Sequence, residues 1–384
     1  MRAPAHLTAA LLRIGRWIAS LGDVEIDPLA LVVERAAVNG YTRQGPISCS
    51  GQSRLIAGAN GWMAVTLARE YDFAAVPAWL ETSTRDVGWD LVEEVVPQRG
   101  TEDLLSRARL LGLPVSRLGS VQPGDGPAVR AHRVGSGQHR SRGVVDAVVV
   151  DLSSLWSGPL CASLLQAAGA RVVKVESATR PDAVRENGEL FDLLHSHQES
   201  VALDFGSTAG RADLRRLLCA ADVVIESARP RAMSQLGIDP LEILEKGKPR
   251  VWVSITGYGC HGDAGNWVAL GDDAAVAGGL VAWDRGRPLF CGDAIADPVT
   301  GLVAAAAVLA AAGAGRWRLD IALGRVAATL AAGDTGDWRH GEPVEAPPLA
   351  MPTRRGAAPM LGQDNERVLG QLAGDDGCRQ PSRT

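Results

Sequence analysis

One stretch constrains the fold more than any other part of the chain. It runs from Val148 to Glu176 and reads strand, tight turn, helix, strand. The β-branched run at its start is typical of a strand buried on both faces. We expect Ser157 to cap the helix, Pro159 to lie near its first position and Gly169 to end it. Such a unit predicts two parallel strands joined by a right-handed crossover.

The same alternation continues to about residue 335. Further strands are expected at 200–203, 222–226, 250–255 and 317–322, and further helices at 208–220, 240–245, 273–278, 298–312 and 325–332. Alternating strands and helices predict an α/β fold, with a Rossmann-like, mostly parallel sheet covered on both faces. The first turn has one glycine, Gly158, where a dinucleotide-binding turn needs three, so we exclude a nicotinamide dehydrogenase.

The rest of the chain divides around this core. Residues 1–120 are expected to form a second, smaller α+β domain, with an N-terminal helix and a hairpin at Ala59-Asn60-Gly61. Further helices are expected at 72–81, 89–96 and 101–111, followed by a closing strand within 111–119. Residues 121–142 lose apolar periodicity and are expected to be a linker. The Rossmann-like core then spans 143–335, and 336–384 form a C-terminal tail with a short helix at 365–372.

Composition argues against several classes of protein. A net charge of −5 gives no indication of a nucleic-acid partner. No window holds 18 uninterrupted apolar residues, so no membrane span is expected. The N-terminal pattern lacks a long apolar core and a convincing cleavage site, which favours a cytoplasmic protein. The six cysteines are scattered, without C-x-x-C spacing, so no metal site is expected.

Asp297 is the strongest candidate for chemistry. It precedes Pro298 and an Ala-rich run, so it is expected to be the N-cap of a helix, which is a sufficient structural reason for both residues. The helix dipole also keeps a carboxylate ionised at this position. A nucleophile requires an ionised, partly desolvated carboxylate, so the structural and the catalytic interpretations are compatible.

Short motifs recur in a fixed order along the chain. They are Asp151-Leu152, Gly158-Pro159, Gly169-Ala170, Val173-Lys174-Val175-Glu176, Val201-Ala202-Leu203-Asp204, Ala221-Asp222, Arg229-Pro230, Leu236-Gly237 and Ser254-Ile255-Thr256-Gly257-Tyr258-Gly259. Asp297 also stands four residues before Gly301, at the mouth of the Ala-rich helix. Together these motifs resemble the class III (CaiB/BaiF type) CoA-transferases, the superfamily of formyl-CoA transferase and α-methylacyl-CoA racemase. The resemblance covers about residues 144–335 and 345–372.

The resemblance implies an enzyme that moves CoA from an acyl-CoA donor to a small carboxylic acid. Asp297 would be the nucleophile and would carry CoA as an aspartyl thioester, with no prosthetic group and no metal. The family also implies a homodimer. The residues that would contact CoA lie in the first turn and after two later strands: Ser154, Leu155, Trp156, Ser157, Leu203, Ser227, Ala228 and Arg229.

Two other functions stay open. Racemases of the superfamily add a histidine in a Gly-His-Asp triplet, which matches Leu270-Gly271-Asp272 here. Gly271 or, with the match shifted by one residue, Asp272 occupies the histidine position, and the missing histidine favours the transferase. His261 remains a candidate proton carrier. A non-catalytic CoA-binding homologue is the third possibility, because Gln198-Glu199 and Ser227-Ala228 depart from the family pattern.

Several residues have two interpretations. Trp156 either stacks on CoA or packs in the core, and the pair Asp272-Asp273 either caps a helix or lines the acyl pocket. Four arginines either bind the CoA phosphates or are ordinary surface charge: Arg180, Arg185, Arg229 and Arg231.

Overall fold

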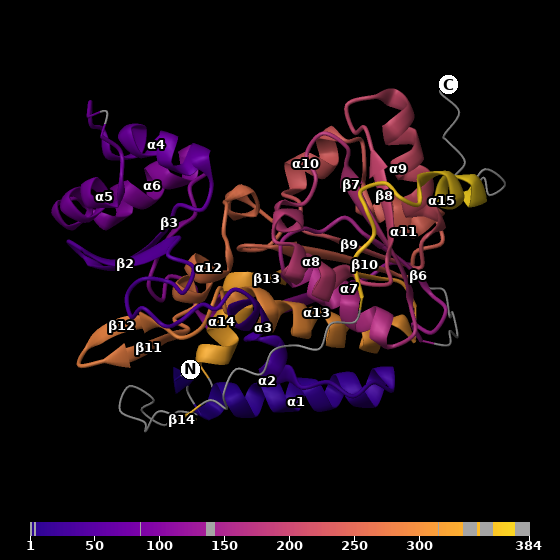
Figure 1. Cartoon of the computed structure of the whole chain (residues 1–384), viewed down its shortest axis with the longest axis horizontal. Helices are drawn as coiled ribbons and strands as arrows, with labels where there is room; N and C mark the ends of the chain where they lie inside the picture. The colour runs from indigo at the N-terminus through magenta and orange to yellow at the C-terminus, as the bar shows by residue number, and fades with distance from the viewer. Residues whose placement is uncertain are drawn as a thin grey trace.

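The computed structural model describes residues 2–3, 5–84, 86–135, 143–313, 315–332, 344–345 and 356–372. Its centre is a seven-stranded sheet with the order β5-β13-β10-β9-β6-β7-β8 (Figure 1). Six strands are parallel, and β5 is antiparallel to β13. The strands are β5 (Val129–Arg133), β6 (Val148–Asp151), β7 (Arg171–Ser177), β8 (Glu199–Leu203), β9 (Val223–Glu226), β10 (Val251–Thr256) and β13 (Trp317–Ala322). The expected α/β class with a Rossmann-like, mostly parallel sheet is confirmed.

Helices cover both faces of this sheet, because successive strand residues point to opposite sides. Val149 faces the layer of α7 and α13, whereas Val150 faces the layer of α9 and α11. The helices of the core are α7 (Ser157–Ala167), α8 (Gly188–His195), α9 (Thr208–Ala220), α10 (Pro230–Gln235), α11 (Pro240–Lys246), α12 (Gly271–Ala277), α13 (Ala296–Ala312), α14 (Leu323–Ala331) and α15 (Asn365–Leu372). Short 3-10 turns occur at Val96–Gln98, Pro123–Asp125, Ala183–Glu186 and Asp263–Asn266.

The opening unit has the predicted order, with one correction at the start of its helix. β6 and β7 pair in parallel, and Gly169, with φ +95°, follows the end of α7 as expected. Ser157 is not the N-cap, however. Trp156 takes that position and makes no side-chain capping bond. The Ser157 hydroxyl donates to Asp297 instead.

A smaller α+β unit lies beside the core. Its antiparallel sheet consists of β2 (Ser53–Gly58), β3 (Gly61–Thr66) and β4 (Val115–Arg117). The hairpin expected around Ala59-Asn60-Gly61 is present, with Gly58 paired to Gly61. Three helices enclose a separate hydrophobic cluster against this sheet: α4 (Glu70–Leu80), α5 (Trp89–Val95) and α6 (Thr101–Leu111). This unit thus has a hydrophobic cluster of its own.

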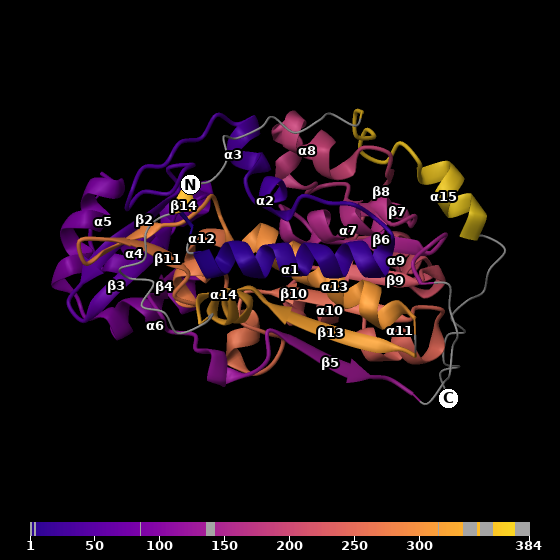
Figure 2. The ribbon, with the colours of Figure 1, turned by 90° about the horizontal axis from the view of Figure 1, so that it is seen from below.

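The N-terminal helices pack elsewhere. α1 (Ala5–Gly22) lies along α13, and Leu7 and Ile18 join the same hydrophobic cluster as α7 and α13 (Figure 2). α2 (Pro28–Leu31) and α3 (Glu34–Val38) follow on the same side. The domain boundaries stay a prediction, but the contacts of α1 join the N-terminus to the core.

Other segments differ from the expectation. Residues 129–133 lie in the segment predicted as a linker, yet they form β5 at the sheet edge. A hairpin of β11 (Val281–Asp284) and β12 (Arg287–Phe290) was not predicted. In the predicted tail, α15 is present, and β14 (Val344–Glu345) pairs with β1 (Arg2–Ala3), whereas most of 336–384 lies outside the described residues. Among the described helices, none combines the length and apolar character needed to cross a membrane.

Candidate functional site

Asp297 lies in the first turn of α13. The helix begins at Ala296, so Asp297 is the second helical residue and not the expected N-cap, which is Ile295. Its backbone N–H donates to the Ala294 carbonyl at 2.8 Å. Its carboxylate Oδ1 accepts a hydrogen bond of 2.9 Å from the Ser157 hydroxyl at the start of α7. Two helix N-termini therefore meet at this carboxylate.

Gly301 explains how the two helices come so close. A Cβ atom at this position would lie 2.7 Å from the Ser157 carbonyl oxygen and 3.0 Å from Leu160 Cβ. Only a glycine lets α7 approach α13 at this distance. Because Gly301 is one helical turn after Asp297, its close contact also brings the Ser157 hydroxyl within reach of the carboxylate. The four-residue spacing thus has a packing reason.

Gly271 lies against the other carboxylate oxygen. A Cβ atom there would be 2.6 Å from Asp297 Oδ2 and 2.4 Å from the Ala294 carbonyl oxygen. This arrangement has no room for any side chain at position 271. A histidine at position 271 would therefore clash with the Asp297 carboxylate.

Arg35 reaches the site from α3. Its Nε and Nη2 donate to the two carboxylate oxygens of Asp293, at 2.7 Å and 2.6 Å. The guanidinium carbon lies 5.2 Å from the ring centroid of Trp156, which is buried. Trp156 therefore packs in the core beneath Arg35 and offers no open face for stacking on a ligand.

Asp272 and Asp273 flank the site on α12. Asp272 accepts from the Ser53 hydroxyl at 2.8 Å and from the Ala294 N–H at 2.9 Å. Asp273 accepts from the Leu270 N–H at 2.7 Å, as a capping carboxylate does. The predicted capping role fits Asp273. Asp272 instead holds the loop that precedes α13 through its hydrogen bond with Ala294.

Burial and neighbouring charges set the protonation of Asp297. Burial raises its pKa to about 6, and the carboxylates of Asp272 and Asp293 act in the same direction. The Ser157 hydrogen bond and the Arg35 charge oppose this rise. Burial likewise raises the pKa of Asp272 to about 6. At pH 7 the Asp297 carboxylate is therefore mostly ionised but less stabilised than it would be in water.

The order of the strands in the sheet reverses beside this site. β7 and β8 follow β6 on one side, whereas β9, β10 and β13 lie on the other. Ligands of open α/β sheets bind at such a switch point, outside the carboxyl ends of the strands. Here the turn after β6 and the turn after β9 meet, since the Ser154 N–H donates to the Ser227 hydroxyl at 3.2 Å. Ser154 and Leu155 are exposed at this edge.

A buried cation fixes the turn after β6. Lys174 donates to the Ser153 carbonyl and, at 3.3 Å, to Asp182. Asp182 in turn accepts from the Leu155 N–H at 3.2 Å, and Leu155 has a left-handed φ of +69°. Although burial lowers the pKa of Lys174, Asp151 and Asp182 raise it overall, so the cation stays charged. Lys174 and Asp182 were not among the predicted site residues, although a lysine within an apolar strand is a visible signal.

The remaining predicted residues also lie at the carboxyl edge of the sheet. The Ala228 N–H donates to Glu226 at 2.8 Å, and Leu203, which is buried, ends β8. Arg229 precedes α10, and its pKa is lowered by partial burial and then by Arg231, with further contributions from Arg69 and Arg180. These arginines form a basic cluster that includes one residue of the smaller unit.

Two other candidates are committed elsewhere. Arg185 pairs with Glu176 at 2.5 Å and lies over the Phe191 ring. His261 is exposed and lies 3.3 Å from Asp320 on β13. No group of three or more His, Cys, Asp or Glu side chains suited to a metal ion occurs within the described ranges.

Comparisons with known proteins agree on one family. A model of CoA-transferase family III matches residues 145–347. The succinyl-CoA–D-citramalate CoA-transferase of Chloroflexus aurantiacus is 28% identical over 188 residues, which are 46% of this chain and 46% of that protein. The formyl-CoA:oxalate CoA-transferase of Escherichia coli is 29% identical over 175 residues, 42% of each. The chain thus spans less than half the length of these relatives. A CaiB/BaiF family protein from Brucella suis aligns at 28% identity with a TM-score of 0.45, covering 50% of this chain and 56% of that one.

Proposed function

Since the chain belongs to CoA-transferase family III, we propose that it moves CoA from an acyl-CoA donor to a small carboxylic acid, with Asp297 as the nucleophile. One observation carries the proposal. The Asp297 carboxylate lies where the N-termini of α7 and α13 meet, within 2.9 Å of a hydroxyl from the turn at the switch point of the sheet.

The first half of the reaction loads CoA onto the protein. An Asp297 oxygen attacks the thioester carbonyl and forms a tetrahedral oxyanion. The oxyanion collapses and expels CoA as a thiolate, which leaves a mixed anhydride between Asp297 and the acyl group. The thiolate then attacks the carbonyl carbon of Asp297, which releases the donor acid as a carboxylate and leaves an aspartyl-CoA thioester. The Ser157 hydroxyl and the Arg35 charge support the negative charge that develops at this site.

The second half runs in reverse with a new acid. The acceptor carboxylate attacks the aspartyl thioester, forming a second anhydride and free CoA thiolate. The thiolate attacks the acceptor carbonyl, which gives the new acyl-CoA and restores the Asp297 carboxylate. No net proton moves, so the site needs an ionised carboxylate and no separate general base.

CoA is proposed to lie in the crevice between the turns after β6 and β9. The exposed residues there are Ser154 and Leu155, and Ser227 and Ala228 lie opposite. The basic cluster of Arg69, Arg180, Arg229 and Arg231 would pair with the phosphates. Trp156 and Ser157 would form the floor of the crevice. Leu203 would line its far end.

The racemase alternative is disfavoured by position 271. Racemization needs a second acid/base group next to the substrate. Gly271 supplies none, and a Cβ at this position would lie 2.6 Å from Asp297 Oδ2. His261 pairs with Asp320 instead.

Intact-mass spectrometry after mixing the chain with a panel of acyl-CoAs tests the proposal. A CoA adduct on Asp297 that hydroxylamine removes, and that is absent from Asp297→Ala, is the expected result. An Asp297→Ala protein that still binds CoA serves as the folded control. Wild-type protein that binds CoA but forms no adduct would instead fit the non-catalytic homologue.

We also propose that the chain works in the cytoplasm as a homodimer, without a prosthetic group or a metal. Light scattering on the purified protein measures the mass directly, and a monomer at micromolar concentration would contradict the dimer. Cell fractionation tests the compartment.

A further inference from the structure

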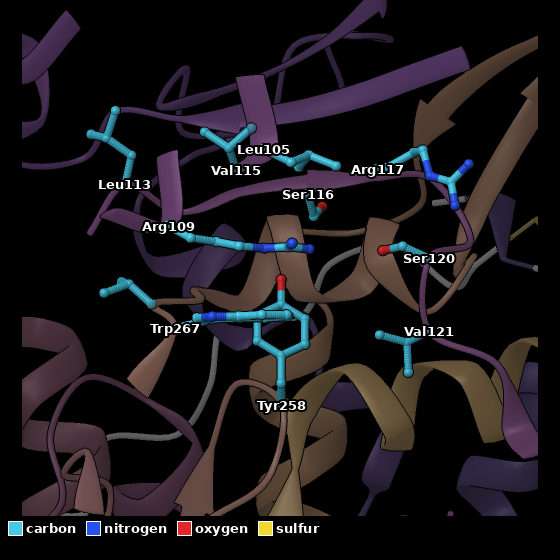
Figure 3. Close-up of a pocket in the computed structure, with 11 residues that line it drawn as sticks. Leu105, Arg109, Leu113, Val115, Ser116, Arg117, Ser120, Val121, Tyr258 and Trp267 are labelled. Atoms are coloured by element: carbon cyan, nitrogen blue, oxygen red, sulfur yellow. The ribbon is translucent and has the colours of Figure 1, made fainter. Parts of the chain in front are cut away.

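A small cavity lies where the smaller unit meets the core (Figure 3). Its volume is about 60 Å³, and it is enclosed by α6, β4 and the loop between β10 and α12. Nothing described for the Asp297 site lines it. Its polar side chains are Arg109, Ser116, Arg117, Ser120, Tyr258 and Trp267.

Arg109 crosses the cavity, and no acidic residue in the described ranges forms an ion pair with it. Its guanidinium carbon lies 3.8 Å from the ring centroid of Trp267, so one face of the cation is covered by the indole. Across the described part of the chain, no carboxylate or carbonyl accepts a hydrogen bond from this guanidinium. Arg107, on the same helix, is by contrast paired with both Glu81 and Asp103. A half-buried guanidinium with five N–H donors and no acceptor is suited to an anion.

Two hydroxyl groups converge on the same space. In Figure 3 the Tyr258 hydroxyl points toward Arg109, and the Ser120 hydroxyl points into the cavity from the opposite wall. Tyr258 packs edge-on against Trp267, with ring centroids 5.7 Å apart. Burial and then the charge of Asp273 hold the pKa of Tyr258 well above its usual range, and a hydrogen bond between the two side chains acts in the same direction. Burial also holds the pKa of Asp273 well above its usual range.

We propose that this cavity binds a small carboxylate. The fork of Arg109 would take both carboxylate oxygens, and the Ser120 hydroxyl would donate to a remaining lone pair. A cavity of about 60 Å³ holds roughly four waters or one carboxylate group, and is far too small for CoA. Apolar side chains line the rest and suit a short alkyl tail: Leu105, Leu113, Val115 and Val121. The inference does not depend on CoA transfer, because neither Asp297 nor any residue in contact with it lines the cavity.

Acetate is the probe for the test, with inorganic phosphate and chloride compared at constant ionic strength. Binding is measured on the full chain by the shift in thermal unfolding and by line broadening of ¹³C-acetate. We expect acetate to stabilise wild-type protein beyond chloride. Arg109→Gln should weaken acetate binding about tenfold or more, the usual effect of losing a hydrogen-bonded charged group.

The matched control is Arg107→Gln, which removes the same charge from the same helix outside the cavity. Arg107→Gln should bind acetate like wild-type protein. If Arg109→Gln does not fold, Arg109→Lys keeps the charge but loses the fork, and should bind acetate more weakly. Equal acetate affinity in wild type and the Arg109 variant, no stabilisation beyond chloride, or tighter binding of phosphate would overturn the proposal. So would loss of CoA binding in Arg109→Gln.

Discussion

At the residue scale, Asp297 is controlled by charges that come from distant parts of the chain. Arg35 and Asp293 act on its pKa in opposite directions, although they are paired with each other. Arg35 is separated from its partner by 258 positions. Local sequence predicts Asp297 from the helix start, but no local pattern connects Arg35 with it, which is why Arg35 was missed.

Arg35→Gln and Asp293→Asn should therefore shift the pH dependence of Asp297 in opposite directions. The ionised carboxylate is the nucleophile, so the rate of CoA adduct formation falls as pH drops through its pKa of about 6. Loss of Arg35 raises that pKa and moves the fall to higher pH. Loss of the Asp293 charge lowers it and moves the fall to lower pH.

Single-turnover adduct formation between pH 5 and 8 measures both shifts. Arg16→Gln, an exposed change on α1, is the control and should leave the profile unchanged. Arg35→Gln leaves Asp293 buried without its cation, so its folding must be checked by circular dichroism. Shifts of the same sign in both variants would contradict the electrostatic interpretation.

The raised pKa of Asp297 also has a cost in stability. Burial raises it to about 6, whereas an unfolded aspartate has a pKa of about 3.9. Between these values the folded state keeps a proton that the unfolded state has lost. The free energy of unfolding therefore falls as pH rises through this window, and the full cost is present above pH 6.

Asp297→Asn should be more stable than wild type at pH 8, by about 1–3 kcal/mol after allowance for partial exposure. The two proteins should have similar stability near pH 4. Urea unfolding at both pH values tests this, with exposed Asp284→Asn as the control. A wild type that is the more stable protein at pH 8 would show that the site does not strain the carboxylate.

At the scale of elements, the contact of α7 with α13 is the critical one. Gly301→Ala would place a Cβ 2.7 Å from a backbone oxygen of α7, and backbone cannot rotate away as a side chain does. We expect a loss of about 1–3 kcal/mol in the free energy of unfolding. The separation of the helices should also weaken the Ser157–Asp297 hydrogen bond and slow adduct formation.

Gly313→Ala is the matched control at the other end of α13. A Cβ there meets nothing within 4 Å, so stability should be unchanged or slightly higher. Denaturant unfolding of both variants compares them directly. Equal stability of the two would mean that the helices adjust without strain.

The elements also show what a sequence can predict. Apolar strands such as β9 and β10 were found because both their faces are buried. β5 was missed because its residues, VRAHR, are largely exposed and pair only at the sheet edge. The β11–β12 hairpin was missed because each of its strands has only four residues, too few for a periodic pattern to stand out. Periodicity reports burial, so it fails where an element is held mainly by hydrogen bonds.

At the scale of the whole molecule, the N-terminal segment joins the core to the site. α1 packs along α13, and α3 then carries Arg35 to Asp293 (Figure 2). The sequence predicted a helix here, but it assigned the helix to the smaller domain. That assignment followed from the position of α1 in the chain, next to the smaller domain. In the structure the apolar face of α1 is buried against the core.

A pair of adjacent substitutions on α1 tests this placement. Leu11 is 1% exposed in the cluster with α13, whereas Leu12 is 41% exposed. Leu11→Ala should lower the free energy of unfolding by about 2–4 kcal/mol, and Leu12→Ala by less than about 0.5 kcal/mol. Because α3 follows α1, Leu11→Ala should also slow CoA adduct formation at Asp297. If Leu11→Ala left both stability and adduct formation unchanged, α1 would not pack on the core, and the route by which Arg35 reaches the site would be wrong.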